Sequence, residues 1–188
     1  MSPPARLEIR IGGTGGQGLI LSAKMLADAL CATGRRVAQS QTYEPTSRGG
    51  YCNSDLVVSA EEVDYPLATA LDCLVLLDAM AVKPSWPLLK AGALVIADSR
   101  LCSELPRSEY LIHHLPLTRS AIELGSERVA NIVALGALAE LTKVCDRKTL
   151  EHAVRAETPK AFLDLNLDAL AAGYRLATEG AAIAAAAG

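Results

Sequence analysis

The stretch Leu7–Gly18, with the sequence LEIRIGGTGGQG, decides the fold that we predict for this chain. Its opening residues alternate between apolar and charged side chains, which is typical of a β-strand with one buried face. Five glycines then fall within seven residues, and the apolar residues after Gly18 recur at helical spacing as far as Gly34. We therefore predict a strand, a tight glycine loop and a helix, in that order.

This glycine loop is a candidate anion site. Glycine allows positive φ angles and lets a ligand approach the backbone closely. The free N–H groups at the start of the following helix would attract a phosphate. From these residues alone, phosphate binding and a purely structural tight turn are equally good interpretations.

The spacing Gly13-x-Gly15-x-x-Gly18 also matches the dinucleotide-binding pattern. In a nicotinamide enzyme an acidic residue about 20 positions further on, at the end of the second strand, binds the ribose. Here that region reads Gln39–Tyr43, and the first acid is Glu44. The missing acid argues against NAD, although a free-standing NAD(P)-binding oxidoreductase remains an alternative. We find no Ser/His/Asp or Cys/His set for nucleophilic catalysis.

Composition narrows the class of protein. The chain has 188 residues, of which 51% are hydrophobic and only 4% aromatic, so we predict a single domain over residues 1–188 with an aliphatic core. A net charge of −3 argues against nucleic-acid binding. No apolar run approaches the roughly 18 residues of a membrane span, and residues 1–10 lack the apolar core of a secretory signal, so we expect a cytoplasmic protein without membrane contact. Five scattered cysteines indicate neither a disulfide framework nor a local zinc or iron–sulfur site.

Beyond the glycine loop, apolar strands alternate with helical patterns. This alternation predicts a Rossmann-like, open, mostly parallel α/β sheet with helices on both faces and a helical C-terminal section. A polar loop over 42–51 contains Pro45 and the pair Gly49-Gly50, and residues 180–188 are expected to fray. The predicted strands are 36–41, 54–59, 71–77, 93–97 and 110–115, and the predicted helices are 79–90 in two pieces, 120–124, 129–144, 146–155 and 161–178.

Several polar residues have an ordinary structural interpretation. Asn131 opens an apolar helix and is expected to bond the backbone. Cys52, beside the two glycines of the polar loop, is a candidate for a partly exposed thiol that nothing activates. The adjacent histidines, His113 and His114, point to opposite faces of a strand and are expected to be structural. The aspartates at the edges of apolar strands suit turns and caps; these are Asp72, Asp78 and Asp98.

Taken together, several linked motifs resemble one family. IGGTGGQG, QSQTYEPTSRGGYCNSDLVVS, VDYP and LDCLVLLD stand in the order and spacing of the gamma subunit of 2-oxoacid:ferredoxin oxidoreductases. ERVANIVALGALAEL and LNLDALAAGY are similar to the C-terminal helices of that family. The glycine loop with VDYP is most similar to the 2-oxoglutarate type, and the pyruvate type and the beta subunit of indolepyruvate oxidoreductase share the same domain.

The resemblance implies a subunit that is inactive alone. The complex would oxidatively decarboxylate a 2-oxoacid on thiamine diphosphate held between alpha and beta subunits, form an acyl-CoA, and pass electrons through iron–sulfur clusters to ferredoxin. For this chain it suggests a hypothesis: two loops at the carboxyl edge of the sheet hold a phosphate of coenzyme A. An interface anchor at Arg48, or a scaffold that binds no ligand, is the alternative. The proposed contacts are Gly13, Gly15, Gly16, Gln17, Gly18, Arg48, Gly49 and Gly50.

Overall fold

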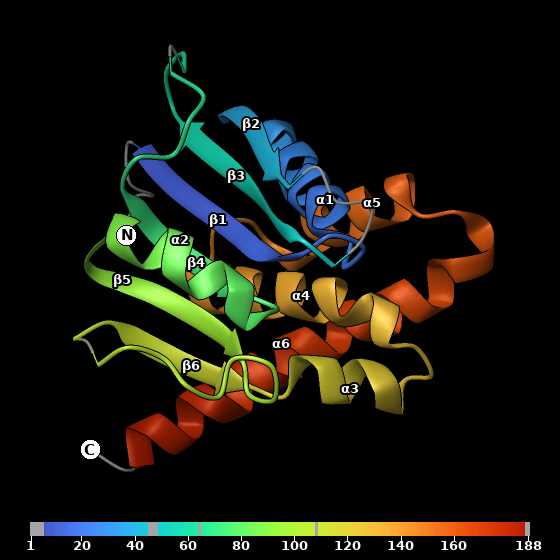
Figure 1. The fold of residues 1–188 in the computed structure, drawn as a ribbon. Coiled ribbons are helices and arrows are strands. Elements are labelled where there is room, and N and C mark those ends of the chain that lie inside the picture. The colour runs from blue at the N-terminus through green and yellow to red at the C-terminus, as the bar shows by residue number, and fades with distance from the viewer. Residues whose placement is uncertain (1–5, 45–48, 64, 108, 187–188) are drawn as a thin grey trace.

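One six-stranded sheet, with the order β2-β3-β1-β4-β5-β6, forms the centre of the molecule (Figure 1). The computed structural model describes residues 6–44, 49–63, 65–107 and 109–186, with side chains as far as residue 179. The strands are β1 (Arg6–Thr14), β2 (Arg36–Tyr43), β3 (Tyr51–Ser59), β4 (Leu71–Leu76), β5 (Leu89–Asp98) and β6 (Leu111–Leu115). The helices are α1 (Leu19–Ala32), α2 (Val82–Ser85), α3 (Leu117–Glu123), α4 (Ala130–Thr142), α5 (Arg147–Glu157) and α6 (Leu163–Ala186).

Five of the six strands run in the same direction. β1, β4, β5 and β6 are parallel neighbours, and β2 shares their direction because both β1 and β2 pair antiparallel with β3. The predicted mostly parallel Rossmann-like sheet is therefore confirmed. The reversed strand β3 was not predicted, and it separates β2 from β1.

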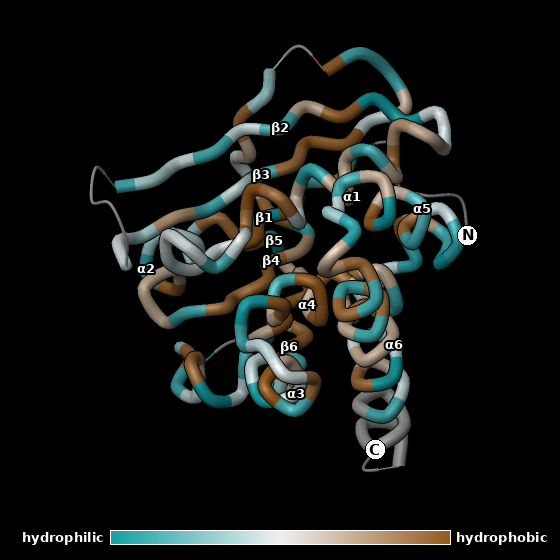
Figure 2. The backbone as a smooth tube through the Cα atoms, turned by 90° about the vertical axis from the view of Figure 1, so that its right-hand side faces the viewer, coloured by the Kyte–Doolittle hydropathy of each residue, from teal (hydrophilic) through white to brown (hydrophobic). Residues whose placement is uncertain are grey.

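Helices cover both faces of the sheet, as predicted. The larger core lies between one face and α1, α4, α5 and α6, whose apolar sides are turned inward (Figure 2). A smaller core on the other face lies under α2, the 3-10 turns that flank it at 79–81 and 86–88, and the segment that leads to β6. Pro84 and Pro87 break this region into short pieces, in agreement with the sequence.

The helix α4 is buried on every side. All residues from Ala130 to Ala139 are buried, and the helix lies between the sheet and α6. Two glycines allow α4 and α6 to touch: a Cβ added at Gly173 would lie 2.0 Å from the carbonyl oxygen of Val133, and one at Gly136 would lie 2.3 Å from that of Leu170. The backbones thus meet where any side chain would separate them.

At the C-terminus the backbone of α6 is helical as far as Ala186. The fraying expected of residues 180–188 stays a prediction. Alanine has the highest helix propensity, and the run of alanines continues a helix already held by packing. Among the described residues, no helix is long and apolar enough to cross a membrane.

The start of β1 is held by a buried carboxylate. Glu8 is 3% exposed and accepts hydrogen bonds from the backbone N–H groups of Thr69 (2.6 Å) and Ala70 (2.8 Å) and from Arg6 Nε (2.9 Å). Burial by itself would raise the pKa of Glu8, but these donors outweigh it and lower the pKa below its ordinary value. The ionised form is therefore favoured by folding.

We expect Glu8→Gln to make the free energy of unfolding less dependent on pH in the acid range. A carboxylate whose pKa is lowered by folding stabilises the protein above the unfolded pKa, and this contribution is lost as the pH falls through the folded pKa. At pH 7 the variant should lose roughly 1–3 kcal/mol, and the loss should shrink below about pH 4. Urea unfolding at several pH values checks this, with the exposed Glu61→Gln as control; a loss that stays constant with pH contradicts it.

Candidate functional site

Two loops meet at the carboxyl end of β1. The backbone N–H of Gly15 donates to the carbonyl oxygen of Gly50 (2.9 Å), and the N–H of Gly49 donates to the carbonyl oxygen of Gly15 (3.4 Å). The glycine loop and the Gly49-Gly50 turn therefore lie side by side, as the sequence predicted. Arg48 lies outside the described residues.

Gln17 closes the glycine loop on itself. Its Oε1 accepts from the N–H of Thr14 (2.8 Å) and its Nε2 donates to the carbonyl oxygen of Leu77 at the end of β4 (3.0 Å). Gly13 leaves room for this amide, because a Cβ there would lie 2.2 Å from Oε1. A ligand contact by Gln17 stays a prediction, and one Nε2 hydrogen is left for it.

Asn131, at the start of α4, makes a hydrogen bond to the end of the glycine loop. Its Nδ2 donates to the carbonyl oxygen of Gly18 (3.0 Å), and the residue is 4% exposed. Gly18 has a φ of +73°, and a Cβ there would lie 2.6 Å from that Nδ2. The backbone role predicted for Asn131 is confirmed, and the third glycine of the motif is required both by its φ angle and by this contact.

The first turn of α1 is open to a ligand. Gly18 is its N-cap and provides no side-chain cap, so the N–H groups of the first turn lack the partners that a helix interior supplies. A cleft of about 470 Å³ opens here. It is lined by Thr14, Gly16, Gly18, Leu19, Ile20, Leu21, Lys24 and Cys52. The cleft therefore faces the positive end of the helix dipole.

The side chains around this cleft leave anion binding to the backbone. Lys24 Nζ pairs with Glu157 (2.7 Å) and Asp28 (2.9 Å), and these carboxylates raise its pKa. Cys52 was expected to be partly exposed, but it is only 6% exposed because β3 is covered by α1, and burial raises the pKa of its thiol. The Cys52 thiol is therefore protonated and unreactive at neutral pH.

A buried ion pair lies under the opposite face of β1. Arg10 Nε and Nη2 each donate to one oxygen of Asp55 at 2.7 Å, and Asn53 Nδ2 donates to Asp55 Oδ1 at 2.7 Å. Burial alone would lower the pKa of Arg10, but the hydrogen bond and charge of Asp55 raise it. Sequence reasoning missed this pair, since the alternation over residues 7–11 indicates a polar face without saying that it is covered.

The turn and cap roles that were predicted are confirmed for Asp98 and Asp78 and are wrong for Asp72, which lies inside β4 and forms an ion pair. Asp98 is fully buried and accepts from the N–H groups of Arg100, Leu101 and Thr118, which joins β5 to α3. Asp78 caps the 3-10 turn Ala79–Ala81 and Asp72 pairs with a lysine. Within the part of the chain that the structure describes, no group of three or more His, Cys, Asp or Glu side chains is arranged to hold a metal ion.

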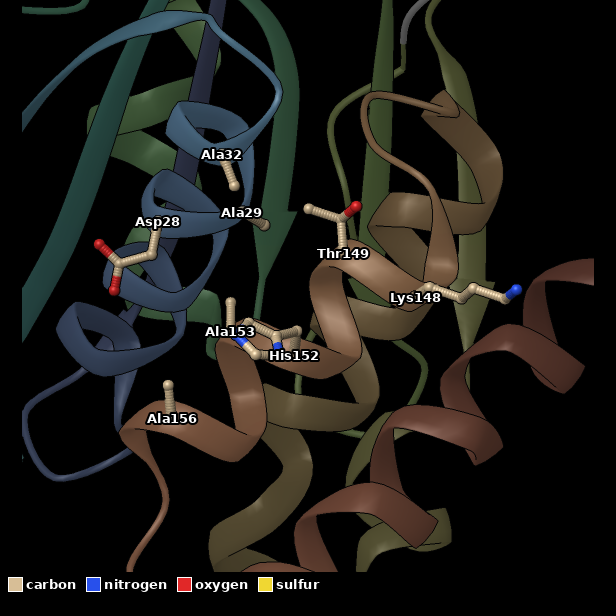
Figure 3. Close-up of a pocket in the computed structure, with 8 residues that line it drawn as sticks. All are labelled: Asp28, Ala29, Ala32, Lys148, Thr149, His152, Ala153 and Ala156. Atoms are coloured by element: carbon tan, nitrogen blue, oxygen red, sulfur yellow. The ribbon is translucent and has the colours of Figure 1, made fainter.

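A second cleft, of about 390 Å³, lies between α1 and α5 (Figure 3). Four of its eight lining residues are alanines; Thr149 and His152 come from α5, and the Asp28 side chain on α1 points away from them. We interpret this cleft as a groove between two packed helices, remote from the glycine loop.

Fold and site together define a Rossmann-like α/β domain whose candidate binding edge is built from backbone rather than from reactive side chains. The chain belongs to the pyruvate ferredoxin/flavodoxin oxidoreductase family, whose model matches residues 8–176. The resemblance of the sequence motifs to this family is thereby confirmed, and the chain is a subunit of an oxidoreductase.

Individual relatives are similar over almost the whole chain. The 2-oxoglutarate synthase subunit KorC of Methanocaldococcus jannaschii is 37% identical over 178 residues, which cover 93% of this chain and 95% of that protein. A solved gamma subunit of a keto/oxoacid ferredoxin oxidoreductase from Geobacter sulfurreducens superposes with a TM-score of 0.86 at 37% identity, covering 94% and 99% of the two chains.

A longer relative contains the same domain. The 2-oxoglutarate:ferredoxin oxidoreductase of Magnetococcus marinus, solved with 2-oxoglutarate, coenzyme A and succinyl-CoA bound, superposes with a TM-score of 0.84 at 27% identity. The match covers 94% of this chain but 32% of that one. In that protein the domain is therefore one part of a larger polypeptide.

Proposed function

We propose that this chain is the gamma subunit of a cytoplasmic 2-oxoglutarate:ferredoxin oxidoreductase, assembled with alpha and beta subunits. The assignment of 2-oxoglutarate as the substrate is supported by the match to KorC subunits over nearly their full length, at 33–37% identity. Relatives named for ketoisovalerate and indolepyruvate reach 28% and 26%. Thiamine diphosphate, bound by the partner subunits, would supply the decarboxylation chemistry, and iron–sulfur clusters would carry the electrons to ferredoxin.

The role that we propose for the chain itself is to hold a phosphate of coenzyme A in the cleft above α1. The uncapped first turn, the left-handed backbone of Gly16 and Gly18, and the size of the cleft support this assignment. The N–H groups of Gly15 and Gln17 already donate to the carbonyl oxygens of Gly50 and Thr14, so the donors are those of Gly16, Gly18 and the first turn of α1. Arg48, next to the Gly49-Gly50 turn in sequence, would add a charge-assisted bond.

A ligand-free scaffold is the second candidate. It is favoured by the exposure of Ile20 and Leu21 at 39% and 40%, since apolar side chains at the rim of the cleft also suit contact with a partner subunit. The alternative of a free-standing NAD(P)-binding enzyme loses support, because β3 separates β2 from β1. The end of β2 therefore does not lie beside the glycine loop where a ribose-binding acid is needed.

We expect Arg48→Ala and Ile20→Glu, each in the assembled complex, to raise the KM for coenzyme A about tenfold, the equivalent of about 1.4 kcal/mol. The first removes a phosphate partner and the second places a negative charge beside the bound phosphate. Steady-state kinetics measure the effect, and the KM for 2-oxoglutarate should stay unchanged. Lys148→Ala, remote on α5, is the control.

Unchanged coenzyme A kinetics in a fully assembled complex would reject the phosphate role and favour the scaffold. The broader assignment is tested separately by purification from native cells. Co-elution with alpha and beta chains that carry thiamine diphosphate supports it, whereas a lone chain that binds NAD(H) contradicts it.

A further inference from the structure

β2 forms a free edge of the sheet, because β3 is its sole strand neighbour among the described residues (Figure 1). Its register with β3 runs from Arg36 to Tyr43 without a bulge, and the strand contains no proline. Arg36 at its start is the one charged residue within it, and Glu44 follows directly after its end. Natural proteins protect such edges with charges, prolines or bulges, and β2 lacks these devices along its middle.

The hydrogen-bonding direction of each β2 residue follows from the pairing with β3. The N–H of Glu44 donates to the carbonyl oxygen of Tyr51 (3.0 Å), in the same register that pairs Ser40 with Asp55. Residues in an antiparallel strand alternate between the two sides, so the even-numbered residues bond β3. The outward N–H and C=O groups are those of the odd-numbered residues Val37, Gln39, Gln41 and Tyr43.

We propose that β2 pairs antiparallel with β2 of a second copy of this chain, around a two-fold axis at Ser40. This register places Val37 opposite Tyr43 and Gln39 opposite Gln41 of the second copy. Every backbone N–H and C=O group that points away from β3 at these four positions then meets a backbone partner. Two copies would then share one continuous twelve-stranded sheet, in an interface where the same surface is used on both sides.

Complementary charge argues for a second copy rather than an unrelated strand. In this register Arg36 stands opposite Glu44 of the second copy, and the symmetry makes that pair twice. Within one chain these two exposed residues are eight positions apart on an extended strand, about 26 Å, so they cannot pair with each other. Slipping the register by two residues would replace the Arg36–Glu44 pairs by Arg36 opposite Thr42.

Apolar contact follows the same register. Tyr43 is 64% exposed, and pairing sets its ring against the half-buried Val37 of the second copy. Cross-strand pairs of an aromatic and a β-branched residue stabilise sheets. The exposed tyrosine is thereby covered at both ends of the paired strands.

Charge reversal in the full chain tests the proposal by sedimentation velocity. The wild type is expected to dimerise, and Arg36→Glu and Glu44→Arg should each weaken the dimer at least tenfold, since each sets two like-charged pairs opposite one another. The double variant Arg36→Glu/Glu44→Arg restores opposite charges and should restore the dimer. Arg175→Glu, an exposed reversal on α6, is the control.

A proline variant distinguishes loss of pairing between the two copies from loss of the fold. Gln41→Pro removes an outward N–H while the bonds between β2 and β3 stay intact, so the variant should keep the circular dichroism of the wild type and sediment as a monomer. A wild-type monomer at all concentrations, a Gln41→Pro dimer, or a double reversal that stays monomeric overturns the proposal. If the single reversals release alpha or beta subunits and the double reversal does not recover them, the edge binds another chain, which also overturns it.

Discussion

Asp55→Ala is expected to lower the free energy of unfolding by about 3–5 kcal/mol. Arg10 stays charged at any accessible pH, and its guanidinium is held by both oxygens of Asp55 beneath the 3-10 turn and α2. The side chains of the pair are 9% and 7% exposed, so water cannot replace the lost carboxylate without disturbing the smaller core. The variant therefore leaves an unpaired charge inside the protein.

A double-mutant cycle isolates this effect. Arg10→Met/Asp55→Ala removes both charges, so it should be less destabilised than the sum of the two single variants, by more than 1 kcal/mol. Urea unfolding followed by circular dichroism provides the values. Arg119→Ala, which breaks an exposed pair on α3, should remain close to wild type. Additive losses in the cycle would contradict the buried coupling.

Gly173→Ala is expected to destabilise the fold by about 3 kcal/mol. In an ordinary helix the same change stabilises by about 0.5–1 kcal/mol, because alanine loses less backbone entropy than glycine. Here the new methyl group would meet the carbonyl oxygen of Val133 and the N–H of Ala137, which are backbone atoms that cannot rotate away. Only a separation of α4 from α6 relieves the clash.

The test is whether Gly173→Ala lowers or raises the free energy of unfolding. Thermal and urea unfolding should show a loss for Gly173→Ala and also for Gly136→Ala, which contacts the backbone of α6 at Leu170. Arg175→Ala, at an exposed position two residues further along α6, controls for helix propensity. Increased stability for Gly173→Ala would show that the two helices are not held at this distance.

Much of the architecture could be predicted from the sequence, because burial leaves a local pattern. The near-continuous apolar run at 71–77 identifies a strand covered on both faces, and β4 is found there in the middle of the sheet. Strand direction leaves no such pattern. The strand β2 is largely exposed and β3 is buried, which suits an edge and an inner strand, but nothing in the sequence of residues 36–59 indicates that β3 is reversed.

The candidate site also has features that could be predicted from the sequence and features that depend on the fold. Glycines 13 to 18 identify the loop, and a backbone role for Asn131 could be predicted, yet its partner lies 113 residues away and only the fold brings it to Gly18. Arg10 and Asp55 are also distant in sequence. Their meeting depends on the antiparallel register of β1 and β3, and their burial depends on the proline-broken segment above them. Contacts of this kind are products of topology and not of local spacing.

The complete enclosure of α4 also bears on how the chain is synthesised. Gly173, which seats α6 against α4, follows Gly136 by 37 residues. At ribosomal rates of about 5–20 residues per second, the apolar flank of α4 waits roughly 2–7 s for its cover. During that interval the nascent chain leaves this apolar surface exposed, and the exposure ends when α6 docks.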